Sequence, residues 1–213
     1  MSARRRWLHI AAICTAWAAL AWVQPALAAP KDFLATRPGA EATRLVDWVL
    51  ESGDARGKPF AVVDKRAARL YVFHADGRLA GHTPALLGST FGDHTVAGVG
   101  ERAQDGTIRV DERTTPAGRF EASAGRNTQG EHVVWVDYAS GFAIHRLRPG
   151  FSYQARASRL ADAQAHAMRV SWGCVVVPVP FYTQVVERVL GQGSSVVYVM
   201  PEAASLQRVF HAL

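Results

Sequence analysis

The chain has only two cysteines among its 213 residues, Cys14 and Cys174. A small scaffold held by several disulfides is therefore excluded, and so is a structural zinc site made of four cysteines. With 49% hydrophobic residues, a chain of this length can bury enough apolar surface to fold without covalent links. The composition predicts an ordinary globular protein with one domain, or at most two small ones.

The motifs that mark common cofactor and metal sites are also missing. The sequence has no glycine-rich dinucleotide-binding or phosphate-binding loop, no pair of cysteines two residues apart, and no histidine pair at the spacing of a zinc protease. Its eight histidines are scattered along the chain. The sequence therefore carries none of these recognised cofactor or metal motifs.

Positive charge is concentrated at the N-terminus. Three arginines at residues 4–6 precede an apolar run over residues 10–23, and small residues follow at 26–29. This order is typical of a secretory signal peptide, which we place at residues 1–29. The apolar run is short for a membrane span and is followed by Pro25, although an uncleaved N-terminal anchor is the alternative.

Removal of this segment changes both the charge and the cysteine count. The segment contains three arginines and no acid, so the formal net charge falls from +6 to +3. The remaining basic residues are interleaved with acidic ones, which argues against a nucleic-acid partner. We expect a periplasmic or otherwise exported monomer that contacts the membrane only through an uncleaved signal. Cys174 is then the sole cysteine.

The hydrophobic spacing predicts a mainly β fold with a few flanking helices. We expect a linker and an N-terminal helix at residues 30–59, the main domain at 60–201, and a short C-terminal helix at 202–213. Strands are expected at residues 60–64, 69–74, 82–88, 108–110, 133–138, 142–145, 175–177 and 195–200, and helices at 41–52, 155–168 and 181–190.

The single remaining cysteine has three interpretations: a nucleophile, a cross-link between two chains, or a buried and inert thiol. Gly173 directly before Cys174 permits a sharp turn that would expose the sulfur, and the N–H groups of these two residues would then form an oxyanion pocket. A cysteine nucleophile also needs a base. His145 is the best candidate because it ends an apolar strand, although a strand-end histidine that contacts only solvent is the alternative.

Several short patterns follow one another in the order seen in one known family. They are the opening strands at 60–73, Thr115-Pro116-Ala117-Gly118-Arg119-Phe120, Ala143-Ile144-His145, and Ser171-Trp172-Gly173-Cys174. In these residues the segment 60–201 resembles the L,D-transpeptidase catalytic domain of exported bacterial cell-wall enzymes. The resemblance implies a β-sandwich or barrel-like fold, Cys174 as the nucleophile and His145 as the general base. Ser171, Trp172 and Gly173 would form the turn around the thiol.

The resemblance also implies a substrate and a reaction, which requires no metal or organic cofactor. Cys174 would attack a peptidoglycan stem peptide, release its terminal D-Ala, and pass the acyl group to an amine of a neighbouring stem. With water as the acceptor, the same site would be an L,D-carboxypeptidase or endopeptidase. A cell-wall-binding module of the same fold without catalysis is a further alternative.

Three departures from the family pattern leave substrate recognition open. Trp172 stands where the family usually has histidine, Val176 where it has asparagine or arginine, and the segment 146–169 is longer than usual. This extension is either a lid or a surface helix. The cation that binds a substrate carboxylate would come from one of Arg146, Arg148, Arg159 and Arg169, of which we favour Arg146 and Arg169.

Overall fold

A computed structural model describes residues 29–211 of the chain. Apart from Ala29, the predicted signal segment therefore lies outside the described residues. Within the described range, no helix combines the length and apolar character needed to cross a membrane.

The described residues form ten strands and seven short α-helices. The strands are β1 (Phe60–Asp64), β2 (Arg69–Phe73), β3 (Leu79–Pro84), β4 (Leu87–Gly88), β5 (Gly118–Arg126), β6 (His132–Asp137), β7 (Phe142–Arg146), β8 (Arg169–Ser171), β9 (Val175–Val177) and β10 (Ser194–Val199). The helices are α1 (Lys31–Ala35), α2 (Ala40–Ser52), α3 (Val99–Gln104), α4 (Tyr153–Asp162), α5 (Val179–Phe181), α6 (Glu187–Val189) and α7 (Leu206–Val209). A π-helical turn, Tyr182–Val186, joins α5 to α6.

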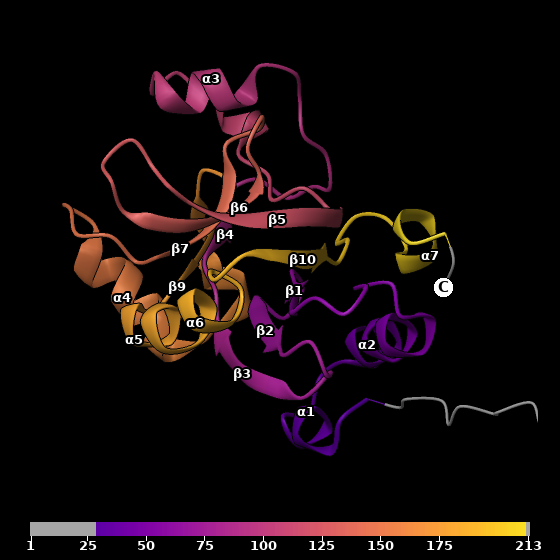
Figure 1. Cartoon of the computed structure of the whole chain (residues 1–213). Coiled ribbons are helices and arrows are strands. Elements are labelled where there is room, and N and C mark those ends of the chain that lie inside the picture. The colour runs from indigo at the N-terminus through magenta and orange to yellow at the C-terminus, as the bar shows by residue number, and fades with distance from the viewer. Residues whose placement is uncertain (1–28, 212–213) are drawn as a thin grey trace, which may run out of the picture.

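Eight of these strands form one sheet in the order β3-β2-β1-β10-β5-β6-β7-β9, while β4 and β8 pair separately. The two ends of the large sheet approach each other. Leu86, two residues after the end of β3, forms an antiparallel bridge with Val176 of β9. The sheet is therefore nearly closed (Figure 1). The predicted mainly β fold with a few flanking helices is confirmed.

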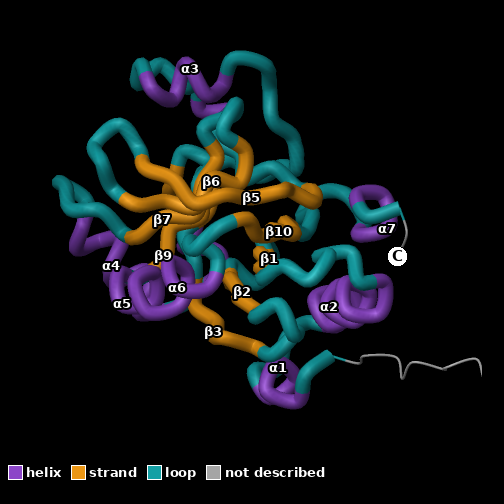
Figure 2. The backbone as a smooth tube through the Cα atoms, in the orientation of Figure 1, coloured by secondary structure: helices purple, strands orange, loops and turns teal. Residues whose placement is uncertain are grey.

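Strand β1 is buried on both of its faces, which explains its uninterrupted apolar sequence. Because successive side chains of a strand point to opposite faces, Ala61 and Val63 belong to the core enclosed by the sheet. Phe60 and Val62 belong to a second core on the outer face, where α1, α2 and α7 lie (Figure 2). The two cores therefore lie on opposite faces of the same strands, and the outer core holds α1 and α2 against the sheet.

The N-terminal helices cover the outer core. Helix α2 ends at Gly53, whose φ of 66° is left-handed, as the sequence predicted. Residues 30–39 were expected to be a linker, but α1 forms there. Phe33 of α1 is fully buried, with its ring 5.1 Å from that of Tyr71 and 5.3 Å from that of Phe73. Burial of this one aromatic side chain explains why the segment is ordered.

The segment between β4 and β5 differs most from expectation. The strand predicted at 108–110 is absent, and the structure has α3 and a short 3-10 turn, Val110–Glu112, in this segment. Helix α3 packs on the turn between β6 and β7, since a Cβ on Gly100 would lie 2.3 Å from the Ala139 carbonyl oxygen. The nine-residue strand β5 was also not predicted, because most of its side chains are polar or small.

Candidate active site

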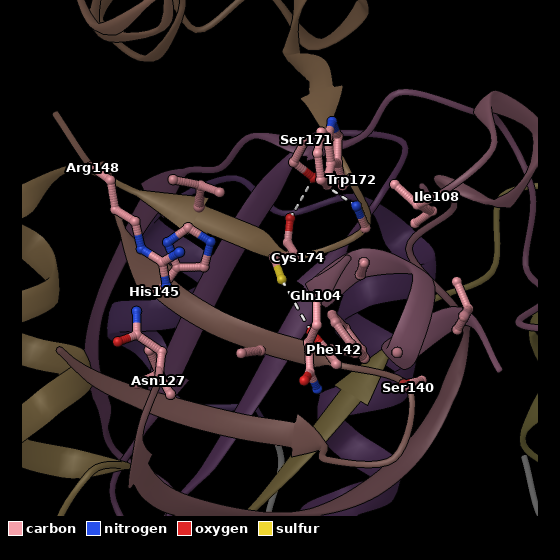
Figure 3. Close-up of a pocket in the computed structure, with 18 of the residues that line it drawn as sticks. Gln104, Ile108, Asn127, Ser140, Phe142, His145, Arg148, Ser171, Trp172 and Cys174 are labelled. Atoms are coloured by element: carbon pink, nitrogen blue, oxygen red, sulfur yellow. Dashed lines mark hydrogen bonds between the residues drawn. The ribbon is translucent and has the colours of Figure 1, made fainter. Parts of the chain in front are cut away.

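A cavity of about 700 Å³ opens beside the ends of β7 and β9. Its walls come from α3, the turns at both ends of β6, the loop that leads into α4, and the turn before β9. Cys174, His145, Arg148 and Trp172 all line it (Figure 3). Residues far apart in the sequence therefore meet around one space large enough for a peptide.

The pairing of β7 with β9 places Cys174 and His145 on the same side. The two strands are parallel, with Ile144 opposite Val175. Cys174 directly precedes Val175, so it lies beside Ala143, and alternation puts it on the same face as His145. Ile144 and Val175 point the other way, into the core. The structure thus brings together the two residues predicted as nucleophile and base.

The turn before the thiol requires glycine. Gly173 has a φ of +129°, and a Cβ there would lie 2.8 Å from the Thr114 carbonyl oxygen. Ser171 closes this turn, because its hydroxyl donates to the Cys174 carbonyl oxygen (2.7 Å) and accepts from the Gly173 N–H (3.1 Å). An oxyanion role for the Gly173 N–H, as the sequence suggested, therefore requires that this hydrogen bond be shared or exchanged.

Thr115, the first residue of the Thr-Pro-Ala-Gly-Arg-Phe motif, holds the same turn from behind. Its buried hydroxyl donates to the Gly173 carbonyl oxygen and accepts from the Gly88 N–H, both at 2.8 Å. Its own carbonyl oxygen accepts from Lys65 Nζ at 2.7 Å. The threonine of this motif therefore connects strand β4 and a buried lysine to the turn that carries Cys174.

Lys65 was not singled out by the sequence, yet it is fully buried behind the site. Its ammonium donates to the Gly92 carbonyl oxygen (2.8 Å) and forms ion pairs with Asp93 (2.6 Å) and Glu202 (3.7 Å). Although burial raises the pKa of Asp93, the Lys65 hydrogen bond and backbone N–H groups outweigh it and lower that pKa to about 2. No local pattern marks a lysine for such a role, because its partners lie far away in the sequence.

The two arginines favoured for substrate binding are engaged elsewhere. Arg169 lies outside the cavity lining and donates to Glu202 and to the Lys65 carbonyl oxygen (3.0 Å). Arg146 is likewise absent from the lining, and its guanidinium pairs with Glu131 at 3.0 Å. Glu202 thus occupies both terminal nitrogens of Arg169, whereas Glu131 occupies one of those of Arg146.

Two arginines of the 146–169 segment do line the cavity, Arg148 and Arg156. One edge of Arg148 is paired, with Nε 2.8 Å from Glu131 Oε2. Arg156 donates to the Arg148 carbonyl oxygen at 2.8 Å and so fixes the loop. The extension at 146–169 therefore contributes a cationic wall to the cavity, whereas its helix α4 exposes much of its surface.

His145 is held in the tautomer that a base needs. Its Nδ1 lies 2.8 Å from the Arg146 carbonyl oxygen. Because a carbonyl oxygen only accepts, we assign the proton to Nδ1, which leaves the lone pair on Nε2. Burial and the positive charge of Arg148 together lower the pKa of His145 to about 4. The imidazole is therefore neutral at neutral pH.

The Cys174 thiol is also neutral at rest. Burial raises its pKa, while the Ala143 N–H and the charge of Arg148 act in the opposite direction. Its sulfur donates to the Gly141 carbonyl oxygen at 3.5 Å. Figure 3 shows the His145 ring and Arg148 on one side of the sulfur. The arrangement is a neutral thiol and a neutral imidazole in one cavity, rather than a preformed ion pair.

The two other departures from the family pattern occupy different places. Trp172 lies on the cavity edge, 48% exposed, with the Arg113 guanidinium carbon 5.1 Å from its ring centre. Val176 is buried, and its backbone exchanges two hydrogen bonds with Leu86 (2.8 and 2.9 Å). Val176 therefore helps to close the sheet, whereas Trp172 offers an aromatic surface at the cavity mouth.

No family model and no curated protein matches the chain. Among solved structures, the LD transpeptidase LdtMt1 in complex with imipenem is similar, with 18% sequence identity and a TM-score of 0.42. The similarity covers 67% of this chain, which spans 58% of the length of that protein. Similarity at this level concerns the fold and says nothing of the side chains of the site.

The low pKa of His145 predicts a specific loss of stability in acid. The pKa of His145 is 6.5 in the unfolded chain and about 4 in the folded protein. Between pH 6.5 and about pH 4, the unfolded chain therefore binds a proton at His145 that the folded protein does not. The wild-type free energy of unfolding should therefore fall by about 2.5 kcal/mol more than that of His145→Gln between pH 7 and 4.5. Urea titrations at both pH values measure it. His166→Gln, at an exposed position, is the control, and equal losses in wild type and His145→Gln would contradict the prediction.

The role of Thr115 predicts a coupled effect on stability and on Cys174. Thr115→Val keeps the shape but leaves the Gly88 N–H and the Gly173 carbonyl without their partner, which should destabilise the protein by about 2 kcal/mol. The loosened turn should also let iodoacetamide alkylate Cys174 several-fold faster. Denaturant titration and timed mass spectrometry measure both effects. Thr107→Val, at an exposed position, should change neither, and an unchanged alkylation rate in Thr115→Val would contradict the positioning role.

Proposed function

We propose that this chain is an exported cysteine acyltransferase that acts on peptidoglycan stem peptides. One observation carries the proposal: Cys174 and His145 share one face of two adjacent parallel strands, at the wall of one cavity. The hydrogen bond of His145 Nδ1 to the Arg146 carbonyl oxygen leaves Nε2 as a proton acceptor, which is what a thiol nucleophile requires. The substrate class rests on the motifs shared with L,D-transpeptidases.

The proposed reaction begins with both groups neutral. As the sulfur attacks the substrate carbonyl carbon, His145 Nε2 takes the thiol proton, and negative charge develops on the carbonyl oxygen. Arg148 lies close enough to act on the charge of the sulfur, so it also opposes the cost of this negative charge. His145 then gives its proton to the departing amine, and a thioester on Cys174 remains.

The second half of the reaction restores the thiol. An amine of a neighbouring stem attacks the thioester, His145 accepts its proton, and the proton returns to the departing sulfur. An amide is formed and the enzyme is unchanged. Water in place of the amine would give a shortened stem, so the acceptor decides whether the enzyme is a transferase or a hydrolase.

The charge of the cavity favours a donor that carries a carboxylate. Three arginines line it, Arg126, Arg148 and Arg156, whereas its only acidic lining residue, Glu112, is paired with Arg102 at 2.7 Å. A guanidinium pairs well with a carboxylate. Because Arg148 is partly buried, water screens its charge less and the attraction is stronger. A peptide stem whose leaving residue ends in a free carboxylate fits this wall.

The first test of the proposal is muropeptide analysis of purified sacculi incubated with wild type and with Cys174→Ser. Wild type should produce new cross-links or shortened stems, and Cys174→Ser neither, because a serine hydroxyl is far less nucleophilic beside a weakly basic imidazole. Matching circular dichroism spectra control for folding. If both proteins bind sacculi and neither alters them, the chain is a cell-wall-binding module and the proposed activity is wrong.

The cationic wall predicts how charged reagents reach Cys174. We expect Arg148→Gln to lower the ratio of the alkylation rate by iodoacetate to that by iodoacetamide about fivefold. The ratio compares an anionic with a neutral reagent on the same thiol, so a change in thiol pKa cancels. Arg146→Gln is the matched control, because Arg146 pairs with the same Glu131 but lies outside the cavity. Equal ratios in the two variants would remove Arg148 as the anion site.

A further inference from the structure

Ala29, at the predicted end of the signal peptide, is buried and hydrogen-bonded. A junction that is only cut and left exposed would need neither contact. The side chain of Ala29 is only 7% exposed and belongs to the outer core together with Phe33 of α1 and Val46 of α2. Its backbone nitrogen lies 2.6 Å from Oδ1 of Asp47, on α2. The residue at the predicted junction is therefore part of the folded domain and touches a carboxylate.

The signal peptide placed at residues 1–29 implies a cut after Ala29, but the same sequence also allows a cut one bond earlier, after Ala28. A cut after Ala28 places Ala26 and Ala28 at the two positions where cleavage sites have small residues. A cut after Ala29 places Leu27 at one of them and must break the bond to Pro30, whose ring constrains the backbone at the cut. The pattern and the structure point to the same bond.

We propose that the Ala28–Ala29 bond is the processing site, and that the ammonium group released on Ala29 forms an ion pair with Asp47. Hydrolysis by a signal peptidase consumes one water, leaving a carboxylate on Ala28 and a protonated amine on Ala29. Before the cut, the nitrogen of Ala29 is an amide with one hydrogen and no charge. After it, the same atom has three donors and a positive charge beside Asp47.

The ion pair would fasten the start of the mature chain to the domain. A charge-assisted hydrogen bond is shorter and stronger than one between neutral groups, and the amide nitrogen of Ala29 in the uncut chain already lies within hydrogen-bond distance of Asp47, at 2.6 Å. Ala29 leads into α1, whose Asp32 accepts from the Leu79 N–H of β3 at 3.2 Å. Processing would therefore complete a connection from the new N-terminus through α2 and α1 to the edge of the sheet.

The position of the cut is tested by exporting the full chain from a bacterial host and measuring the intact mass of the purified protein. We expect the mature protein to begin at Ala29. A protein that begins at Pro30, or one that keeps the signal, would overturn the proposal. This measurement does not depend on catalysis, so it stands apart from the test of the acyltransferase function.

The ion pair is tested by acetylating the α-amine of the exported protein with a succinimidyl ester near pH 7. A paired ammonium is a poor nucleophile, so the Ala29 amine of wild type should react about fivefold more slowly than that of Asp47→Asn. Glu51→Gln, an exposed acid on the same helix, is the matched control and should behave as wild type. Equal rates in wild type and Asp47→Asn would overturn the ion pair even if the cut is at Ala29.

Discussion

The buried ammonium of Lys65 is the constraint on which the geometry of the candidate site depends. A charge removed from water costs several kcal/mol unless it is paired and hydrogen-bonded, so its partners must be in place for the fold to form. They are Asp93, Glu202 and the carbonyl oxygens of Gly92 and Thr115. Three separate segments are thereby fixed around one atom. Because Thr115 also holds the Gly173 turn, the position of the thiol follows from this charge.

Burial has a second consequence, which concerns the thiol and the imidazole of the candidate site. It disfavours the charged forms of both His145 and Cys174, so neither is ionised at rest. A histidine with a pKa of about 4 is a weak base, but its protonated form is a strong acid. Such a group returns its proton readily to a departing amine. In the proposed reaction, such a site would favour collapse of the tetrahedral intermediate over storage of a thiolate.

Sequence reasoning predicted the β architecture, which the structure confirms, and singled out Cys174 and His145, which the structure places on one face of two paired strands. Both predictions depend on local signals: alternating apolar residues, a glycine before the thiol, and short motifs. Of the four arginines it named for substrate contact, it favoured Arg146 and Arg169, which lie outside the cavity, because an arginine's partner cannot be read from its neighbours in sequence. Arg169 is taken by Glu202, 33 positions away, and Arg148 faces the cavity only because of how its loop folds. Helix α1 was missed because its order comes from Phe33 packing on β2.

In the proposed reaction, the position of Arg148 would connect substrate binding to the strength of His145 as a base. Its positive charge is the second cause of the low pKa of His145, after burial. A substrate carboxylate bound to Arg148 would cancel much of that charge, and the pKa of His145 would rise toward its ordinary value. His145 would then become a better acceptor for the thiol proton only when a carboxylate-bearing donor is present. A neutral peptide of the same size would leave the pKa of His145 low and the base weak. The enzyme would then prefer a carboxylate-bearing substrate in the chemical step as well as in binding.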